Sequence, residues 1–427
     1  MKHLIMKFLN LEPSIIHDIE VLTSGNEVFA FISLRSSEHV CPHCKTATYR
    51  IHDYRKRTID HAILNGLNMT LVYNQRRYFC PHCQRAFPEK NPFVFPGKRL
   101  SKYTVMRVME ELRNPRVTFS MAAASTSISE TTAVRIFDLH AGICSHPFPE
   151  ILCIDEVYAI KYRQKVYACV LVDFNSKNIY DLLPGRKKYQ LADYFSKINR
   201  KTRAKVRYIS MDMWDTYRDI ASIYFKNAKI CVDSFHVVNL VNRAFTQVRI
   251  RIMKSYKTDS EEYYLLKRFA WLLNMDYEKI PKEQTIFIRK YISFLHCRTI
   301  PATDLVNTIV AINYELGLAY TLKDEFLTIN KSATPDTIEA ALDEYINTLI
   351  SFQIPEFLSV AKTMKKWRQE IINSFDTIDG RRISNGPVES VNSRIKLIKT
   401  SSNGYMNFDR FRRRVLYSLN SGSSIKF

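Results

Sequence analysis

The sequence has few glycines and prolines and no long apolar run. Its 427 residues include only 10 Gly and 15 Pro, while 46% are hydrophobic. This composition excludes an intrinsically disordered or low-complexity chain, because there is ample apolar surface to bury. No stretch reaches the roughly 18 consecutive apolar residues of a membrane span. The N-terminal apolar run is interrupted at Asn10 and Glu12, so we expect no signal peptide and a soluble protein.

Acidic residues are in the minority. Asp and Glu number 42 against 63 Lys and Arg, which gives a formal net charge of +21. Because the composition is that of a folded protein, this charge belongs to a folded surface, and its expected partner is a polyanion such as nucleic acid. The length suffices for roughly three domains of about 150 residues each.

Cysteine is used in two different ways. Nine Cys is an odd number, and five of them stand singly in apolar surroundings, which predicts reduced, buried thiols in a cytosol. The five single cysteines are Cys144, Cys153, Cys169, Cys231 and Cys297. The other four form two pairs.

The two cysteine pairs predict a structural zinc site. Cys41-Pro-His-Cys44 and Cys80-Pro-His-Cys83 repeat one four-residue knuckle, and four thiolates in a tetrahedron select Zn²⁺. Residues 49–58 and 69–79 have the aromatic, β-branched alternation of the strands of a zinc ribbon. Two unrelated buried or redox-active pairs are the alternative. Residues 41–100 carry 11 Lys or Arg against 3 acids, so this ribbon is also expected to contact phosphates.

Three short helices are expected between residues 103 and 140. The segments 103–113, 119–125 and 129–140 have helical apolar spacing, and Ser129 suits the N-cap of the third. The arrangement resembles a helix-turn-helix that would present Thr131, Thr132 and Arg135 to DNA. A small helical bundle that only connects two domains would look similar.

From residue 151 the pattern changes to strands. Three β-type runs are followed by helix and strand in alternation, an order of βββαβαβ. This order is expected of a ribonuclease-H-like fold, although other α/β layouts share it. The predicted strands are 151–160, 165–174, 178–183, 206–211 and 229–232, and the predicted helices are 189–200 and 214–225.

Carboxylates occur where a strand is interrupted or ends. Asp155 breaks the apolar run of the first strand and Asp212 follows the fourth. A buried carboxylate is costly unless it is compensated, and a divalent metal is one such compensation. Turn capping or pairing with Lys or Arg is the alternative for each acid. Glu156 and Asp173 are similarly placed, so the pattern alone does not decide among the four.

A further acid lies near the C-terminus. Pro387 suits the first position of a helix, which places Glu389 in its first turn. From residue 380 onward there are 10 Lys or Arg against 2 acids, so this carboxylate is surrounded by basic residues that can bind phosphate.

The stretch from about 246 to 380 has the amphipathic pattern of an all-α insertion, with Trp271 and Trp367 expected in its core. The predicted fold is therefore a multidomain α/β protein. Its expected parts are a zinc-ribbon region at 1–95, a helix-turn-helix at 100–145, a ribonuclease-H-like catalytic core at 150–245 and 381–427, and the helical insertion at 246–380.

These motifs together resemble the bacterial DDE transposases of the ISL-three insertion-sequence family, over essentially the whole chain. The most specific pieces are Ile154-Asp155-Glu156, Met211-Asp212-Met213-Trp214 with Tyr217, Asp233-Ser-Phe-His236, and Asn385-Gly-Pro-Val-Glu389 through Asn392, Lys396 and Gly404-Tyr405.

The resemblance implies an enzyme that binds terminal inverted repeats and target DNA, cleaves DNA and transfers strands with Mg²⁺ or Mn²⁺. It implies a cytoplasmic, nucleoid-associated homo-oligomer and no membrane partner. It assigns the catalytic, metal-binding role to Asp155, Asp212 and Glu389, and an auxiliary role to Asp233 and His236. The basic residues expected to position phosphates are Arg394, Lys396, Arg412, Arg413 and Arg414. A non-catalytic zinc-ribbon regulator and a structure-specific nuclease on the same fold are the rival interpretations.

Overall fold

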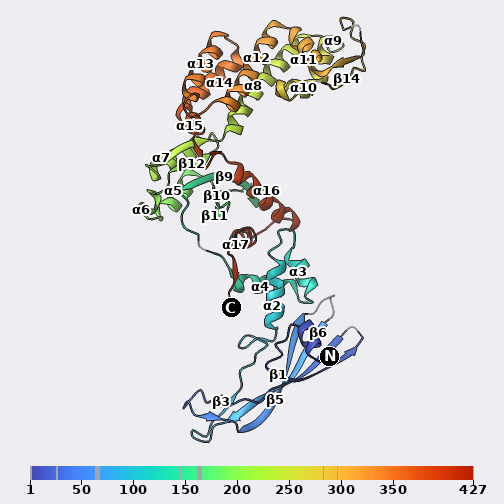
Figure 1. Ribbon diagram of the computed structural model, residues 1–427, viewed down its shortest axis with the longest axis vertical. Coiled ribbons are helices and arrows are strands. Elements are labelled where there is room, and N and C mark those ends of the chain that lie inside the picture. Colours follow the sequence, from blue (N-terminus) through green and yellow to red (C-terminus); the bar gives the residue numbers. More distant parts are fainter. Residues whose placement is uncertain are drawn as a thin grey trace. The chain divides into compact units, whose positions relative to one another are not determined.

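The computed structural model describes residues 2–25, 27–62, 68–144, 146–160, 166–281, 283–295 and 297–426. The chain divides into two compact units. Unit 1 consists of Met1–His146, Tyr158–Val166 and Val391–Phe427, and unit 2 of Pro147–Val157 and Tyr167–Ser390. Figure 1 labels the elements of both units.

Unit 1 begins with a five-stranded sheet. Its strand order is β1-β2-β6-β5, with β7 paired to β6. The β2–β6 pair is parallel, whereas β1–β2, β5–β6 and β6–β7 are antiparallel. The elements are α1 (Lys2–Phe8), β1 (Ile16–Ser24), β2 (Glu27–Leu34), β3 (His39–Val40), β4 (Ala47–Thr48), β5 (Ile51–Ala62), β6 (Asn68–Phe79) and β7 (Ala86–Pro88). The two strands expected of the ribbon are thus present, but they belong to a larger sheet.

Four helices complete unit 1. They are α2 (Lys102–Glu111), α3 (Phe119–Ser125), α4 (Glu130–His140) and α17 (Phe408–Leu419). Ser129 is the N-cap of α4 and accepts a hydrogen bond from the Thr132 amide, as predicted. Tyr417 of α17 is buried in the same apolar cluster as α2, α3 and α4. The short strands β8 (Ala141–Gly142) and β18 (Ser424–Ile425) pair and tie the C-terminal segment to α4.

Unit 2 is built on a second five-stranded sheet with the order β11-β10-β9-β12-β13. β12 is parallel to both β9 and β13, and β10 is antiparallel to β11. The elements are β9 (Ile151–Ile160), β10 (Val166–Asp173), β11 (Ile179–Leu183), α5 (Lys188–Ser196), α6 (Arg200–Arg203), β12 (Tyr208–Met211), α7 (Asp215–Tyr224) and β13 (Lys229–Val232). The predicted order of strands is confirmed, while the helix expected at 189–200 is two helices, because Asn199 caps a new one.

The rest of unit 2 is mainly helical, and in Figure 1 these helices gather into one body. The elements are α8 (Ser234–Ser255), α9 (Glu261–Arg268), α10 (Ala270–Leu273), a 3₁₀ turn (Tyr277–Lys279), β14 (Thr285–Phe287), β15 (Thr299–Pro301), α11 (Ala302–Ala311), α12 (Tyr314–Ser332), α13 (Ile338–Ser351), α14 (Pro355–Lys366), α15 (Arg368–Asn373), β16 (Thr377–Ile378) and β17 (Arg381–Arg382). Helix α16 (Gly386–Ser401) then starts in unit 2 and continues into unit 1.

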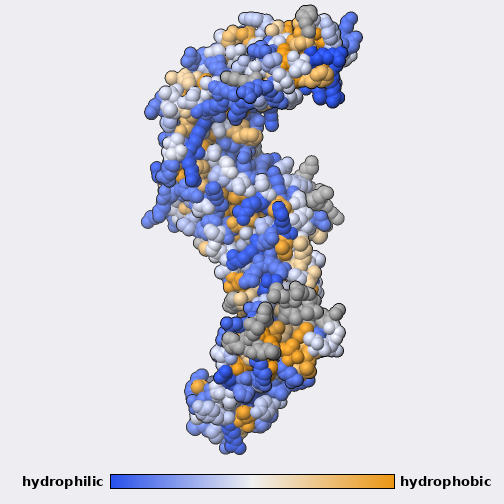
Figure 2. Space-filling model, turned by 45° about the vertical axis from the view of Figure 1, so that its right-hand side comes forward, coloured by the Kyte–Doolittle hydropathy of each residue, from blue (hydrophilic) through white to orange (hydrophobic). Residues whose placement is uncertain are grey.

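Two burial predictions are only partly right. Trp367 is buried at 3% exposure, but Trp271 is 51% exposed, because Leu272 and Leu273 of the short helix α10 fill the core instead. Among the single cysteines, Cys153, Cys169 and Cys231 are buried, whereas Cys144 is half-buried and Cys297 is exposed. On the face drawn in Figure 2, hydrophobic residues lie in separate patches among hydrophilic ones. Within the described residues, no helix is both long and apolar enough to cross a membrane.

Candidate functional sites

The four paired cysteines converge in unit 1. Cys41 Sγ lies 3.6 Å from Cys83 Sγ, and Cys44 Sγ lies 3.4 Å from Cys80 Sγ. All four sulfur atoms lie within 4.8 Å of one another. A disulfide would need about 2.05 Å, whereas a tetrahedron with Zn–S distances of about 2.3 Å separates its sulfurs by roughly 3.8 Å. The donor set and its spacing therefore fit Zn²⁺.

The two knuckles have the same backbone geometry. The Lys45 amide donates to the Cys41 carbonyl and the Gln84 amide to the Cys80 carbonyl. Lys45 and Gln84 both have positive φ, at 63° and 53°, so each tight turn ends in the left-handed region. This shared turn brings both sulfurs of each pair to the same side.

In unit 2, the register of three parallel strands aligns three aspartates. Met211 pairs with Ile154 of β9 on one side and with Val232 of β13 on the other. The residues that follow these partners are Asp155, Asp212 and Asp233. The three carboxylates therefore lie at one level of the sheet.

Asp212 is the centre of a contact network. His236 Nε2 lies 2.9 Å from Asp212 Oδ1, and Asn385 Nδ2 donates to the same oxygen at 3.4 Å. The backbone N–H of Asn385 also donates to Asp233 Oδ1 at 3.5 Å. Asp212, Asp233 and His236 can offer ligand atoms within 4.8 Å of one another. Together they form an oxygen- and nitrogen-rich group able to hold a divalent metal.

Burial, hydrogen bonds and neighbouring charges shift the pKa values of the residues in this network. Burial, followed by the nearby Asp212 carboxylate, raises the pKa of Asp155 to about 7. Burial also raises the pKa of Asp233, and the Glu389 charge contributes to that rise. The hydrogen bond to Asp212 raises the pKa of His236. Carboxylates crowded in this way favour a cation among them.

The structure places the sequence-predicted acids close to one another but not all within reach of one ion. Within the described chain, Asp155 and Glu389 are not part of the group whose ligand atoms lie within 4.8 Å; Asp233 and His236 are. Asp155 Oδ1 instead accepts a hydrogen bond from the Glu156 amide at 2.6 Å.

Two competing carboxylates have other partners. Asp173 accepts hydrogen bonds from the Asn175 amide and the Ser176 hydroxyl, so it caps the turn after β10. Glu156 forms an ion pair with Arg186 and accepts a hydrogen bond from the Tyr217 hydroxyl at 3.2 Å. These contacts favour Asp155 and Asp212 over Glu156 and Asp173 among the four acids that the sequence pattern left open.

The predicted DNA-contacting residues differ in exposure. Thr131 and Arg135 are exposed on α4, while Thr132 is half-buried and its hydroxyl lies 2.8 Å from that of Ser129. Arg394 and Lys396 are exposed on α16.

The arginine run on α17 is not a uniform basic surface. Arg413 is half-buried and donates to the Asp138 carbonyl at 2.9 Å, and Arg412 is also half-buried. Arg414 is 1% exposed and donates to the carbonyls of Leu112, Asn114 and Val117. Its prediction as a DNA contact is wrong in this structure, because a guanidinium so enclosed cannot reach a phosphate.

A cavity of about 310 Å³ opens beside Asp212. Its lining includes Arg186, Asn239 and Arg243, which the sequence analysis did not single out. Asn239 and Arg243 follow His236 at spacings of three and seven on α8, so the periodicity of this helix is a signal that could have identified them.

Comparison with known proteins identifies the class of protein. A family model for DDE transposases of the ISL3 type, described as a transposase, matches residues 152–415. A second model, the zinc finger of the transposases IS204, IS1001, IS1096 and IS1165, matches residues 37–83. The chain therefore belongs to the ISL3-type family of DDE transposases, as its motifs predicted, and its function is that of a transposase.

Individual relatives agree with this assignment. The chain is 19% identical over 407 residues to the transposase for insertion sequence element IS1001 of Bordetella parapertussis, which covers 91% of this chain and 90% of the relative. It is 24% identical over 273 residues to the transposase for IS1557 of Mycobacterium tuberculosis, covering 59% of this chain and 56% of the relative.

Proposed function

We propose that this transposase cleaves the ends of an insertion sequence and joins them to target DNA, with Asp155, Asp212 and Glu389 as its catalytic carboxylates. The observation that carries this proposal is the register of β9, β12 and β13, which aligns Asp155 with Asp212 inside the segment matched by the transposase family. The auxiliary pair Asp233 and His236 lies in the same group as Asp212.

The donor set suits Mg²⁺ or Mn²⁺, since carboxylate oxygens are the ligands these ions prefer. Asp155, Asp212 and Glu389 would supply carboxylate ligands to two metal ions, with Asp233 and His236 beside Asp212. When bound, two such ions supply charge stabilisation to the attacking and leaving oxygens of an in-line phosphodiester displacement. His236 holds the Asp212 carboxylate in place through its 2.9 Å contact. Water cleaves the element end to leave a 3′-OH, and that hydroxyl then displaces an oxygen of the target phosphodiester.

We propose a ribonuclease-H-like fold for the sheet of unit 2. Three consecutive strands at one side, followed by two strands parallel to β9, support this assignment. The proposed catalytic core is 150–245 together with 381–427, interrupted by the helical insertion at 246–380. The zinc-ribbon region is proposed at 1–95.

Helices α2, α3 and α4 are proposed as a helix-turn-helix within residues 100–145 that reads the terminal inverted repeats. The side-chain cap at Ser129 and the exposed Thr131 and Arg135 support α4 as the helix that meets DNA. Arg394, Lys396, Arg412 and Arg413 are proposed to position phosphates of element or target DNA. The active form is proposed to be a homo-oligomer on DNA, in the bacterial cytoplasm.

The test is a cleavage and joining assay on labelled element ends with Mg²⁺ or Mn²⁺. We expect Asp155→Asn, Asp212→Asn and Glu389→Gln each to lower product formation by at least about 100-fold, because each removes a charge needed at the reacting phosphate. DNA binding should be largely unchanged. Asp173→Asn is the matched control, since it removes an aspartate at a strand end that only caps a turn.

Each outcome has a distinct meaning. Full joining by any one folded variant removes that residue from the catalytic set. Cutting without joining by the wild-type protein indicates a nuclease on this fold. Binding without cutting indicates a regulator or an inactive copy.

A further inference from the structure

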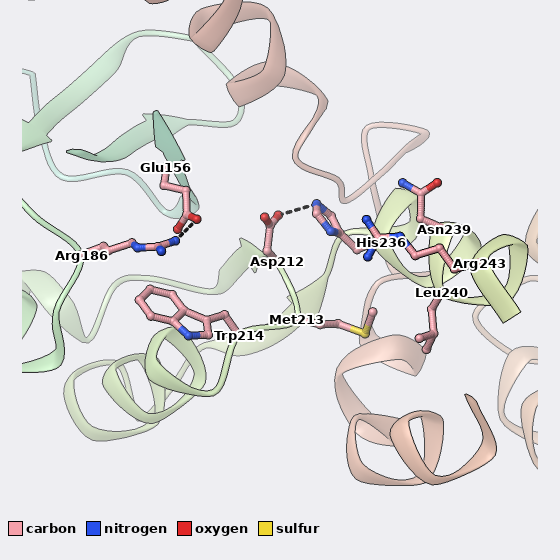
Figure 3. Close-up of a pocket in the computed structure, with 9 residues that line it drawn as sticks. All are labelled: Glu156, Arg186, Asp212, Met213, Trp214, His236, Asn239, Leu240 and Arg243. Atoms are coloured by element: carbon pink, nitrogen blue, oxygen red, sulfur yellow. Dashed lines mark hydrogen bonds and ion pairs between the residues drawn. The ribbon is translucent and has the colours of Figure 1, made fainter. Parts of the chain in front are cut away.

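Two arginines lie on opposite sides of Asp212 in the cavity beside the carboxylates. In Figure 3, Arg186 lies on the β11–α5 side and Arg243 on the α8 side, with Asp212 between them. We propose that Arg186 and Arg243 bind the DNA phosphates on the two sides of the scissile phosphate, so that the cleaved strand crosses the site from one arginine to the other. This inference rests on the proposed catalytic role of Asp212.

Arg186 is held rigidly at its end of the cavity. Its guanidinium carbon lies 4.3 Å from the centre of the Tyr167 ring and 5.0 Å from that of the Trp214 ring. Glu156 accepts a hydrogen bond from Nη1, and the Tyr217 hydroxyl donates to the other oxygen of Glu156. A guanidinium has five N–H donors, so fixing one nitrogen and stacking the plane leaves donors to offer to a phosphate.

Arg243 belongs to one face of α8. His236, Asn239, Leu240 and Arg243 occupy positions i, i+3, i+4 and i+7, and all four line the cavity. Arg243 is exposed, and among the described residues no carboxylate forms an ion pair with it. A long basic side chain of this kind is available to an anion.

The lining of the cavity suits a DNA strand better than a small apolar ligand. It is open to solvent beside the acids, and besides the two arginines it offers the Asn239 amide and the apolar Met213 and Leu240. Arg side chains bind phosphate oxygens with two N–H groups at once, and such contacts fix the position of a strand without reading its sequence. A volume of about 310 Å³ suits a segment of backbone, not a duplex.

The test combines arginine variants with neutral DNA linkages. Asp212→Asn protein is used throughout, so that binding is measured without cleavage. Arg186→Gln and Arg243→Gln should each weaken binding to element ends about tenfold and lower the slope of log K against log salt by roughly 1. Lys254→Gln is the matched control, because Lys254 is an exposed base on the same helix three turns beyond Arg243 and outside the cavity.

Methylphosphonate linkages placed one at a time around the scissile position identify the phosphates. At one position on one side of the scissile phosphate, the neutral linkage should weaken DNA binding by Asp212→Asn protein. The same linkage should not weaken binding further when the protein also carries Arg243→Gln. A position on the other side should behave in the same way for Arg186→Gln. The proposal would be overturned if the effects of the linkage and of the arginine variant on binding were additive at every position. It would also be overturned if the positions that depend on Arg186 and on Arg243 lay on the same side of the scissile phosphate.

Failure of this proposal is separable from failure of the proposed function. If Asp212→Asn abolishes cleavage but the linkage effects are additive, the catalytic assignment of Asp212 stands and the two arginines do not bind the flanking phosphates. If the Asp212→Asn variant still cleaves but the linkage effects depend on the arginines, the phosphate contacts are supported and Asp212 is not a catalytic residue. Arg243 carries the test if Arg186→Gln does not fold, since Arg243 is exposed.

Discussion

Asn385 is the residue that joins the carboxylate group to the sheet. It is 1% exposed, and its Nδ2 donates both to the Ile154 carbonyl at 3.2 Å and to Asp212 at 3.4 Å. Its backbone carbonyl accepts from the Glu389 amide at 3.1 Å, at the start of α16. Through its side chain and its backbone carbonyl, Asn385 thus contacts β9, the aspartate that follows β12, and the helix that carries Glu389.

We predict that Asn385→Ala lowers the affinity for Mn²⁺ by roughly 10- to 100-fold, the usual cost of losing a group that orients a metal ligand. Mn²⁺ binding, measured by electron paramagnetic resonance without DNA, checks this. Asn373→Ala is the control, because Asn373 Nδ2 donates to the Ile230 carbonyl of β13 at 2.9 Å, whereas Asn385 Nδ2 donates to the Asp212 carboxylate. Equal affinities in the two variants would contradict a positioning role for Asn385.

At this scale the sequence pattern indicates candidate acids but not the contacts that position them. Asp155 and Asp212 interrupt or end apolar runs, which is visible in a linear pattern. Asp233 follows β13 in the same way, and only the parallel register shows that it stands beside Asp212. Arg186 gave no linear signal, because its partners Glu156, Tyr167 and Trp214 come from three other segments.

Among the elements, α17 departs most from what its sequence indicated. Its arginines are predicted to face DNA, yet Arg414 is buried against the α2–α3 connection and Arg410 forms an ion pair with Asp138 of α4 at 2.7 Å. Buried Arg is rare unless its donors are satisfied, and here three backbone carbonyls and the Ser418 hydroxyl accept them. The last helix is therefore a structural part of the helical cluster in unit 1.

We predict that Arg414→Ala destabilises unit 1 by at least about 3 kcal/mol, because the buried Leu112 carbonyl and the part-buried carbonyls of Asn114 and Val117 lose the charged donor that Arg414 supplies. Thermal unfolding should show a lower transition, together with weaker binding to element ends. Lys396→Ala removes an exposed base and should leave the transition nearly unchanged. A stable Arg414→Ala protein with reduced DNA affinity would instead assign Arg414 to the DNA surface.

Elements with strong local patterns were predictable, and those defined by distant pairing were not. The bounds of β9 and α3 agree with the predicted segments, since apolar runs and helical spacing are local signals. The sheet that joins β2 to β6 in parallel was not foreseen, because the pairing connects Glu27 with Asn68 across 41 positions of sequence. The close packing of Tyr417 with α2 likewise depends on contacts more than 300 residues apart.

Over the whole chain, the positive charge is unevenly distributed. Residues 41–100 and 380–427 together carry 21 Lys or Arg against 5 acids, whereas residues 271–380 carry 15 acids against 11 bases. A polyanion should therefore bind the zinc-ribbon region and the C-terminal segment rather than the helical insertion. Such binding is strongly salt-dependent, falling about 10³- to 10⁵-fold between 50 and 200 mM salt for 6 to 10 phosphate contacts.

This distribution makes zinc removal informative, because charge and folded shape contribute differently to DNA binding. Without Zn²⁺, no metal–sulfur bonds hold Cys41–Cys44 against Cys80–Cys83, although the four sulfurs lie within 4.8 Å of one another. The apolar cluster around Tyr78 and Phe87 is too small to replace those bonds. We expect a chelator, or Cys41→Ser/Cys80→Ser, to abolish the preference for element ends over random DNA while the basic residues still bind both with a steep salt dependence. Competition binding at two salt concentrations measures both quantities, and Cys297→Ser, at an exposed single cysteine, is the control. Unchanged preference for element ends in the double variant would mean that the ribbon does not contribute to sequence recognition, leaving α4 as the reader of the repeats.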